Sequence, residues 1–293
     1  MAIFKGSGVA LVTPMNADGS VNYEELKALT QWHIDEGTDA IIACGTTGET
    51  STLVDAEHLK VIETVVKQVD GRIPVIAGTG SNDTQHGIYL SVEAEKLGAD
   101  ALLIVTPYYN KATKNSLVKH YEAICSKVNL PVILYSVASR TGLNLTPDLV
   151  KELMKIPNVK GIKEASGDIS QIVAIACLVN DDFALYSGND DQVLPLLSVG
   201  GSGVISTIGN IAPKQTSQMV HHFLNGQFEE AKKIQLAQYP LIEAIFSEVN
   251  PVPIKKAVGL LKGIETHYRL PLGQPEEETV ELLKETMTNY GLI

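Results

Sequence analysis

Lys163 stands near the end of an apolar segment, VKGIKEASGD, which begins at Val159. The apolar interiors of barrels and sheets rarely accept an ammonium group. Because side chains alternate along a strand, Lys163 shares a face with Gly161 and Ala165, and these small residues leave space for it. Burial disfavours the charged form of the amine, and a neutral amine can attack a carbonyl carbon to form a Schiff base. The alternatives are an ion pair with Glu164 or another carboxylate, and a side chain that extends to the rim.

The segment GTTGE places Thr46 and Thr47 between two glycines, directly after another apolar run. Two hydroxyls and several backbone N–H groups on such a turn form a small anion cradle, which suits a carboxylate. A plain turn between a strand and a helix is the alternative, and it would be favoured if the motif stood alone.

Tyr135 and Arg140 occur in the segment LYSVASRTG, after the apolar run that precedes that of Lys163. If the two strands are neighbours, the phenol of Tyr135 reaches a carbonyl carbon bound to the lysine and can transfer protons. The planar fork of Arg140 suits bidentate capture of a carboxylate, and the only other arginines are Arg72 and Arg269. The alternatives are a packing tyrosine and an arginine in a surface ion pair.

Two further tyrosines, Tyr108 and Tyr109, follow a proline in the segment PYYNK. Exposed paired phenols suggest a subunit interface or a substrate lid. Core packing is the alternative, but successive residues point in different directions, so at most one of the two fits a core.

The apolar runs that carry these motifs recur along the chain and indicate the fold. They are GVALVTP, DAIIACG, PVIAGTG, ALLIVTP, PVILYS, VKGIKEAS, FALYSGN and GVISTIGN. Runs of this composition are typical of parallel strands that are buried on both faces. Helical patterns separate them, and Asn22 with Glu25 resembles a capping box that opens the first helix. Two helices show apolar stripes: Leu59, Ile62, Val66 and Val69 in one, and Ile169, Ile172, Val173 and Ala176 in the other.

Strands and helices that alternate eight times predict an α/β protein of the (β/α)8 TIM barrel type. The runner-up, an open doubly wound sheet, needs a glycine-rich dinucleotide loop after its first strand, and TPMNADG is not one. We expect a barrel catalytic domain over residues 1–225 and a C-terminal helical extension over 226–293, whose last helix starts at Pro275. All the motifs above then lie at the carboxyl ends of strands, where barrel enzymes have their active sites. The opposite rim carries ordinary loop residues: Asp39, Arg72, Pro74, Asp100, Pro131 and Asn158.

The composition excludes several classes of function. The chain has 293 residues, of which 44% are hydrophobic, and a formal net charge of −11 without a basic run. We therefore expect no nucleic-acid partner and no attraction to anionic membranes. The three cysteines form no CxxC pair, so the sequence suggests neither zinc nor a disulfide framework. The N-terminus has no apolar run long enough to span a membrane and no cleavage-site pattern, so we expect a cytoplasmic enzyme.

The motifs GTTGE, PYYNK, Y…RTG and KEASG, in this order and at these strand ends, resemble those of the pyruvate-dependent class I aldolase superfamily. Within it the chain is most similar to the dihydrodipicolinate synthase family, over essentially its whole length and including NPVPIKKA in the C-terminal part. The resemblance implies condensation of pyruvate with L-aspartate 4-semialdehyde, the first committed step of lysine and diaminopimelate biosynthesis. It implies no metal and no organic cofactor.

For pyruvate, the resemblance implies that Lys163 forms the Schiff base and that Thr46 and Thr47 hold the carboxylate. It also implies that the backbone at Gly188 and Ile205 lines the pyruvate site.

For the remaining steps, the resemblance implies that Tyr135 donates and accepts protons, connected through Thr46 to Tyr109 of a neighbouring subunit. Arg140 is implied to bind the carboxylate of the semialdehyde. Members of the family are usually homotetramers, built as dimers of dimers.

Two rival functions are an N-acetylneuraminate lyase or keto-deoxy-sugar-acid aldolase of the same superfamily, and a catalytically silent barrel. The sister lyases typically have a serine in place of Thr46 and lack an arginine at the position of Arg140. Intact Lys163, Tyr135 and Thr46 argue against the silent barrel.

The chain departs from the family pattern at two places. The loop that normally reads YNVP reads YSVA here, so Ser136 and Ala138 replace an asparagine and a proline, and we expect a more mobile loop around Arg140.

The second departure lies in a cleft at which lysine inhibits some members of the family. The matching parts of this chain are segments 50–58 and 81–86 and Tyr108. Lysine-sensitive members have a glutamate where this chain has His86, and Asp55, a possible substitute, follows the catalytic turn on a different loop. This predicts weak or absent inhibition.

Overall fold

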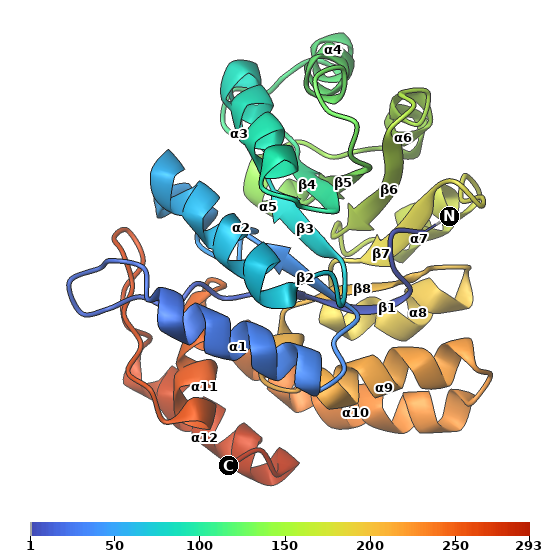
Figure 1. Cartoon of the computed structure of the whole chain (residues 1–293). Helices are drawn as coiled ribbons and strands as arrows, with labels where there is room; N and C mark the ends of the chain where they lie inside the picture. The colour runs from blue at the N-terminus through green and yellow to red at the C-terminus, as the bar shows by residue number, and fades with distance from the viewer. Residues whose placement is uncertain (1) are drawn as a thin grey trace.

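The computed structural model describes residues 2–293, and its centre is a closed barrel of parallel strands in sequence order (Figure 1). The barrel closes because β1 pairs in parallel with β8, with Gly6 opposite Gly203 and Gly8 opposite Ile205. The predicted (β/α)8 barrel is therefore confirmed, and the open doubly wound sheet is excluded.

The strands are β1 (Gly6–Ala10), β2 (Ala40–Ala43), β3 (Val75–Gly78), β4 (Ala101–Val105), β5 (Val132–Ser136), β6 (Val159–Glu164), β7 (Ala184–Ser187) and β8 (Gly203–Ser206). The α-helices are α1 (Tyr23–Asp35), α2 (Asp55–Val69), α3 (Thr84–Lys96), α4 (Lys114–Cys125), α5 (Ala138–Thr141), α6 (Pro147–Leu153), α7 (Ile169–Ala176), α8 (Val193–Ser198), α9 (Pro213–Leu224), α10 (Phe228–Ile245), α11 (Val252–Lys262) and α12 (Glu277–Tyr290). Short 3₁₀ turns are η1 (Thr50–Thr52), η2 (Asp190–Gln192) and η3 (Ile208–Asn210).

The strands separate two apolar layers because successive side chains point to opposite faces. The layer inside the barrel includes Ala10, Ile42, Ile76, Leu103, Ile133, Tyr135, Tyr186 and Ile205. The layer beneath the helices includes Ile41, Leu102, Leu134 and Ile162. On β6, Gly161 lies opposite Ile133 and Lys163 lies opposite Tyr135. The alternation therefore directs the side chain of Lys163 into the barrel.

The predicted helix signals have mixed outcomes. Asn22 caps α1, and its side chain accepts a hydrogen bond from the backbone N–H of Glu25 at 3.0 Å. In α2 the predicted stripe is confirmed at Ile62 and Val69, which are buried.

The stripe predicted for α7 was partly wrong. Ile172 is buried, but Ile169 and Val173 are 43% and 44% exposed. The second buried residue is Ile175 instead. Apolar residues occupy nearly every position of this helix, so their periodicity does not select one face.

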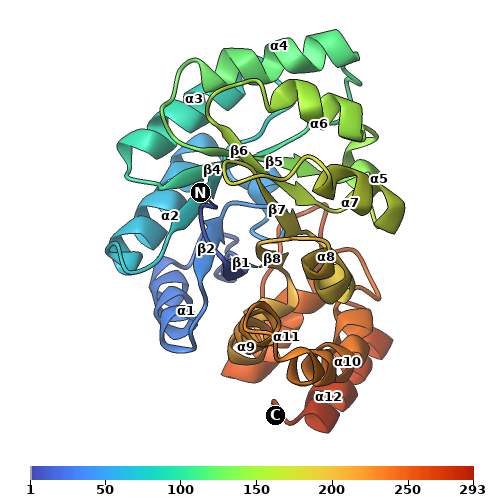
Figure 2. The ribbon, with the colours of Figure 1, turned by 90° about the vertical axis from the view of Figure 1, so that its right-hand side faces the viewer.

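The helices α10, α11 and α12 follow the barrel on one side of the molecule (Figures 1 and 2). There α10 packs against α9 and α12, and Lys262 at the end of α11 lies over the ring of Trp32 in α1. The last helix begins at Glu277, two residues after the predicted start, and buries Leu283 and Met287. The division of the chain at residue 225 stays a prediction. None of the helices within residues 2–293 is long and apolar enough to cross a membrane.

We predict that the protein loses stability as the pH falls from about 6.5 towards 4. Burial lowers the pKa of His33 to about 3 and that of His58 to about 4. In this range the unfolded chain binds protons that the folded chain does not, so the free energy of unfolding falls by up to about 1.4 kcal/mol per pH unit for each histidine. Thermal unfolding between pH 7.5 and 5 measures the slope. His33→Asn should have a lower melting temperature than the wild type at pH 7.5, and its melting temperature should depend less on pH. His222→Gln, at a half-buried site, should keep the pH dependence of the wild type.

Candidate active site

Lys163 lies inside the barrel near the carboxyl end of β6, with its side chain 6% exposed. Its Nζ is 4.4 Å from the centre of the Tyr135 ring on the neighbouring strand. The carboxylate of Glu164 points elsewhere, where it accepts hydrogen bonds from Ser166 N at 3.0 Å and from Gln171 Nε2 at 2.7 Å. Lys163 thus neither pairs with Glu164 nor extends to solvent, and its amine faces the phenol that was predicted to transfer protons.

Gly188, at the end of β7, makes space for this lysine. A Cβ atom at Gly188 would lie 3.1 Å from Lys163 Cε, 3.0 Å from the carbonyl oxygen of Glu164 and 2.7 Å from Ala165 Cβ. A larger residue would therefore displace the lysine or the neighbouring backbone. That the backbone at Gly188 lines the pyruvate site stays a prediction.

The turn after β2 carries Thr46 and Thr47. The backbone N–H groups of Gly48 and Glu49 donate to the carbonyl oxygens of Gly45 and Thr46, both at 3.1 Å. These N–H groups close the turn on itself and are therefore not available to a bound anion. That Thr46 and Thr47 hold a carboxylate stays a prediction.

Asn250, just before α11, contacts the turn from the C-terminal extension, and the sequence did not point to it. Its Nδ2 donates to the hydroxyl oxygen of Thr47 at 3.1 Å, and Thr47 is 2% exposed. Because the oxygen of Thr47 accepts this bond, the hydroxyl proton is free to be donated to an anion. The carbonyl oxygen of Asn250 accepts a hydrogen bond from Arg140 Nη2 at 2.9 Å. One residue therefore connects the predicted anion turn with the predicted carboxylate-binding arginine.

Arg140 belongs to α5, a short helix that fills the segment predicted to be a mobile loop. The segment is held at both ends, since Ser136 Oγ accepts from Leu145 N at 3.2 Å and Thr106 Oγ1 donates to Thr141 Oγ1 at 3.0 Å. Arg140 itself is exposed and is anchored to the backbone of the extension rather than to a surface carboxylate. The greater mobility expected of this segment stays a prediction.

Ala138 occupies the first position of α5, where proline is well tolerated. We expect Ala138→Pro to raise the free energy of unfolding by about 0.4–1 kcal/mol, because proline restricts the unfolded chain. Chemical denaturation and initial rates check this. If stability and turnover both fall, the segment does not accept proline, and the ψ of 69° at Val137 would be the reason, since residues before proline prefer larger values.

A cleft of about 320 Å³ opens beside these residues and is lined by Thr46, Tyr108 and Arg140, among others. Thr46 also lines a small hollow next to it, together with Tyr135. Tyr109, by contrast, is 90% exposed and has a left-handed backbone conformation, with φ of 72°. Tyr108 thus faces the cleft of its own chain, and Tyr109 faces outward.

Ile205 is fully buried on β8, in the same interior layer as Tyr135. A residue that the sequence reasoning missed, Asp190, connects this part of the site to β7. Its carboxylate accepts hydrogen bonds from Ser206 Oγ at 2.6 Å and from Thr207 N and Ile208 N at 2.9 Å. Burial raises the pKa of Asp190, although these hydrogen bonds and the nearby charge of Lys163 oppose the rise. In the sequence, the only sign of a role for Asp190 is its position in SGNDD, directly after the glycine and asparagine that follow the strand.

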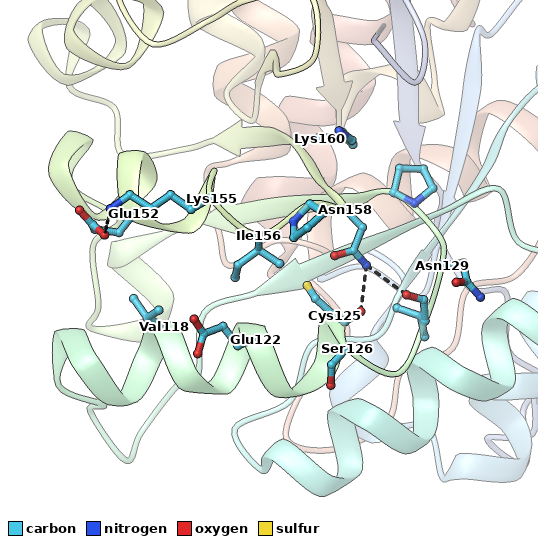
Figure 3. Close-up of a pocket in the computed structure, with 13 residues that line it drawn as sticks. Val118, Glu122, Cys125, Ser126, Asn129, Glu152, Lys155, Ile156, Asn158 and Lys160 are labelled. Carbon is cyan, nitrogen blue, oxygen red and sulfur yellow. Dashed lines mark hydrogen bonds and ion pairs between the residues drawn. The ribbon is translucent and has the colours of Figure 1, made fainter.

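A larger hollow of about 690 Å³ lies at the opposite rim, between α4 and α6 (Figure 3). Two of its polar contacts lie within the lining: Asn158 Nδ2 donates to the carbonyl oxygen of Cys125 at 3.1 Å, and Lys155 pairs with Glu152 at 2.6 Å. Asn158 and Pro131 precede β6 and β5, so this rim holds the amino ends of the strands. Such a rim contributes to stability in barrels rather than to catalysis.

Most of the candidate site residues therefore gather at the carboxyl ends of β2, β5, β6 and β7 and on β8, whereas Tyr109 faces outward. A model of the dihydrodipicolinate synthetase family matches residues 3–290. The chain belongs to this family. Across residues 2–293, no three His, Cys, Asp or Glu side chains are grouped so as to hold a metal ion.

Three members of the family illustrate the similarity. The 4-hydroxy-tetrahydrodipicolinate synthase of Caldicellulosiruptor saccharolyticus is 53% identical over 100% of this chain and 99% of its own. A crystal structure of the chloride-inhibited dihydrodipicolinate synthase of Acinetobacter baumannii, complexed with pyruvate, has 43% identity and a TM-score of 0.96 over 99% of each chain. That of the enzyme from Cyanidioschyzon merolae, with lysine bound, has 38% identity and a TM-score of 0.96 over the full length of both chains.

Proposed function

We propose that the chain is a 4-hydroxy-tetrahydrodipicolinate synthase, a lyase of the class I aldolase type, which condenses pyruvate with L-aspartate 4-semialdehyde in lysine and diaminopimelate biosynthesis. Full-length relatives at about half identity support this proposal, as does the pyruvate complex of a similar structure. The observation that carries it is the amine of Lys163, buried inside the barrel beside the ring of Tyr135.

The proposed reaction begins when Thr46 and Thr47 hold the carboxylate of pyruvate through their hydroxyl groups. The free hydroxyl proton of Thr47, whose oxygen already accepts from Asn250, suits this task. The amine of Lys163, in its unprotonated form, attacks the ketone carbon, and loss of water gives the imine. Tyr135 accepts and returns the protons that this step moves. Loss of a methyl proton from the imine then gives the enamine.

The second substrate binds with its carboxylate at Arg140, which faces the cleft from α5. The enamine carbon attacks the aldehyde carbon and forms the new carbon–carbon bond. The amine of the semialdehyde then attacks the imine carbon, and Lys163 leaves as the ring closes. The lysine amine is thus regenerated and no redox step is needed.

A coupled assay tests the proposal by comparing pyruvate plus aspartate semialdehyde with N-acetylneuraminate and keto-deoxy-sugar acids. We expect turnover only with the first pair. Turnover of a sugar acid instead would place the chain among the sister aldolases. Absence of both turnover and a borohydride-trapped pyruvate adduct would indicate a catalytically silent barrel.

We also propose that the enzyme works in the cytoplasm as a homotetramer made of two dimers. The exposed side chain of Tyr109 supports a paired arrangement, because it faces away from the cleft of its own chain and the family resemblance implies that it acts in the site of a neighbouring subunit. Light scattering coupled to size-exclusion chromatography gives the mass, and a monomer with full activity would contradict the proposal.

We predict that L-lysine inhibits this enzyme weakly or not at all. Asp55 was expected on a separate loop, but it opens α2 and His86 lies in the first turn of α3. Both residues line the same cleft, and Nε2 of His86 donates to Oδ1 of Asp55 at 2.9 Å. The carboxylate of Asp55, which could bind an ammonium group of lysine, is therefore already hydrogen-bonded to His86. The imidazole of His86 itself binds an ammonium group less well than the glutamate of lysine-sensitive members does.

Initial rates with millimolar L-lysine at saturating pyruvate measure the inhibition. The matched variant His86→Glu should gain partial, non-competitive inhibition, because it restores the acid of lysine-sensitive members. Strong inhibition of the wild type would show that Asp55 serves as the acid despite its contact with His86.

A further inference from the structure

The turn that carries Thr46 and Thr47 ends in a buried ion pair with the C-terminal extension. Nζ of Lys255, on α11, lies 2.5 Å from Oε1 of Glu49. The two side chains are 3% and 0% exposed, and the residues are 206 positions apart in the chain. Lys255 Nζ also lies 5.2 Å from the centre of the Tyr268 ring.

A buried ion pair is weak evidence for a contribution to stability. The cost of removing two charges from water offsets much of their attraction, and apolar residues of similar size often serve as well. The second carboxylate oxygen of Glu49, Oε2, is buried without a hydrogen-bond partner among the described residues, which adds to that cost. The location of the pair at the candidate active site therefore suggests a role other than stability.

The backbone of the turn needs to be held in place from outside. Cys44 and Glu49, just before and at the end of the GTTGE segment, have φ values of 57° and 55°, in the left-handed region that residues other than glycine avoid. Such conformations persist where surrounding contacts fix them. The contacts that fix this turn are the Lys255–Glu49 pair, the bond from Asn250 to Thr47, and the bond from Thr13 Oγ1 to the carbonyl oxygen of Gly48 at 2.7 Å.

We propose that Lys255 is a positioning residue, which acts through Glu49 to hold Thr46 and Thr47 where they bind the carboxylate of the keto-acid substrate. This inference rests on the proposed function. It assigns the C-terminal extension a part in substrate binding, because α11 supplies the cation and the segment just before α11 supplies Asn250.

The proposal separates binding from chemistry. The reacting amine belongs to β6 and lies beside Tyr135, whereas Lys255 contacts the turn after β2. Loss of the pair therefore weakens pyruvate binding strongly and lowers the rate at saturating pyruvate by a smaller factor, because Thr46 also belongs to the implied proton path of Tyr135. It leaves the KM for the semialdehyde nearly unchanged, since that carboxylate belongs to Arg140.

The test uses the full-length protein and borohydride trapping of pyruvate on Lys163 over a range of pyruvate concentrations. For Lys255→Met we expect the half-saturating pyruvate concentration to rise about tenfold, with the same final adduct yield. Steady-state kinetics should show the same rise in the KM for pyruvate alone. Glu49→Gln, whose amide oxygen can still accept from Lys255, should give a clearly smaller rise.

The matched control is Met287→Ala, a buried residue of α12 that loosens the same extension without touching the turn. It should lower the melting temperature and leave the half-saturating concentration unchanged. An unchanged value in Lys255→Met, or an equal rise in Met287→Ala, overturns the proposal. If Lys255→Met does not fold, Glu49→Gln decides, and the absence of any rise overturns it. If wild-type protein forms no adduct at Lys163, the proposed function itself fails.

Discussion

Incubation of the protein with pyruvate and borohydride should add one reduced pyruvyl group, at Lys163, and Lys163→Ala should abolish turnover. Reduction by borohydride converts the imine to a stable amine, so the adduct records the residue that attacked the ketone. The geometry makes Lys163 the expected residue, since its amine is buried inside the barrel at 4.4 Å from the Tyr135 ring. Without a nucleophile the enamine cannot form, and among the described residues Lys163 is the lysine that lies over the Tyr135 ring.

Lys160 provides a matched control on the same strand. It lies near the start of β6 and lines the hollow at the opposite rim. Lys160→Ala should keep both the adduct and the turnover. Peptide mass mapping that locates the adduct on another lysine, or finds none in active enzyme, would remove Lys163 from its role.

Much of the fold was predictable because parallel strands of a barrel are buried on both faces. Each strand is then a short apolar run, which the sequence shows directly without a choice of face. The proximity of Tyr135 and Lys163 followed from the same source, since the two residues end adjacent runs and the structure pairs them. The register shift between Val132 and Ile133 in the same pair of strands was not predictable in this way. The buried faces of the helices are harder to predict from the sequence. The exposed Ile169 and Val173 of α7 show that an almost wholly apolar helix does not reveal which side packs on the barrel.

The contacts that hold the site in place were not predictable from the motifs. Lys255 is one of two consecutive lysines in NPVPIKKA, and such a pair is typical of a solvated helix face, yet Lys255 is 2% exposed. Its partner Glu49 ends a motif that was interpreted through its hydroxyl and N–H groups. A single sequence carries no signal for a contact between residues 206 positions apart, because it depends on how α11 packs against the barrel.

Arg140→Ala is expected to impair use of the semialdehyde far more than Schiff-base formation with pyruvate. Loss of a charged hydrogen-bond partner costs about 1.5–3 kcal/mol, or roughly ten- to a hundredfold in kcat/KM for the semialdehyde. In the proposed function, the carboxylate of pyruvate is held by a different part of the site, the turn of Thr46 and Thr47. The pyruvate concentration that gives half-maximal borohydride trapping should therefore stay close to that of the wild type. Arg72→Ala, which removes an arginine bound to Gln31 at the opposite rim, should change neither measurement.

The contact between Arg140 and Asn250 makes the comparison with pyruvate decisive. Arg140 Nη2 donates to the backbone of Asn250, whose side chain holds the hydroxyl of Thr47. If this contact were the main task of the arginine, its loss would disturb the turn and impair both substrates equally. Arg140→Lys distinguishes the two roles further, because an ammonium keeps the charge but not the planar fork. It should retain pyruvate trapping and recover only part of the semialdehyde step, whereas equal losses in both steps would make Arg140 a support for the turn.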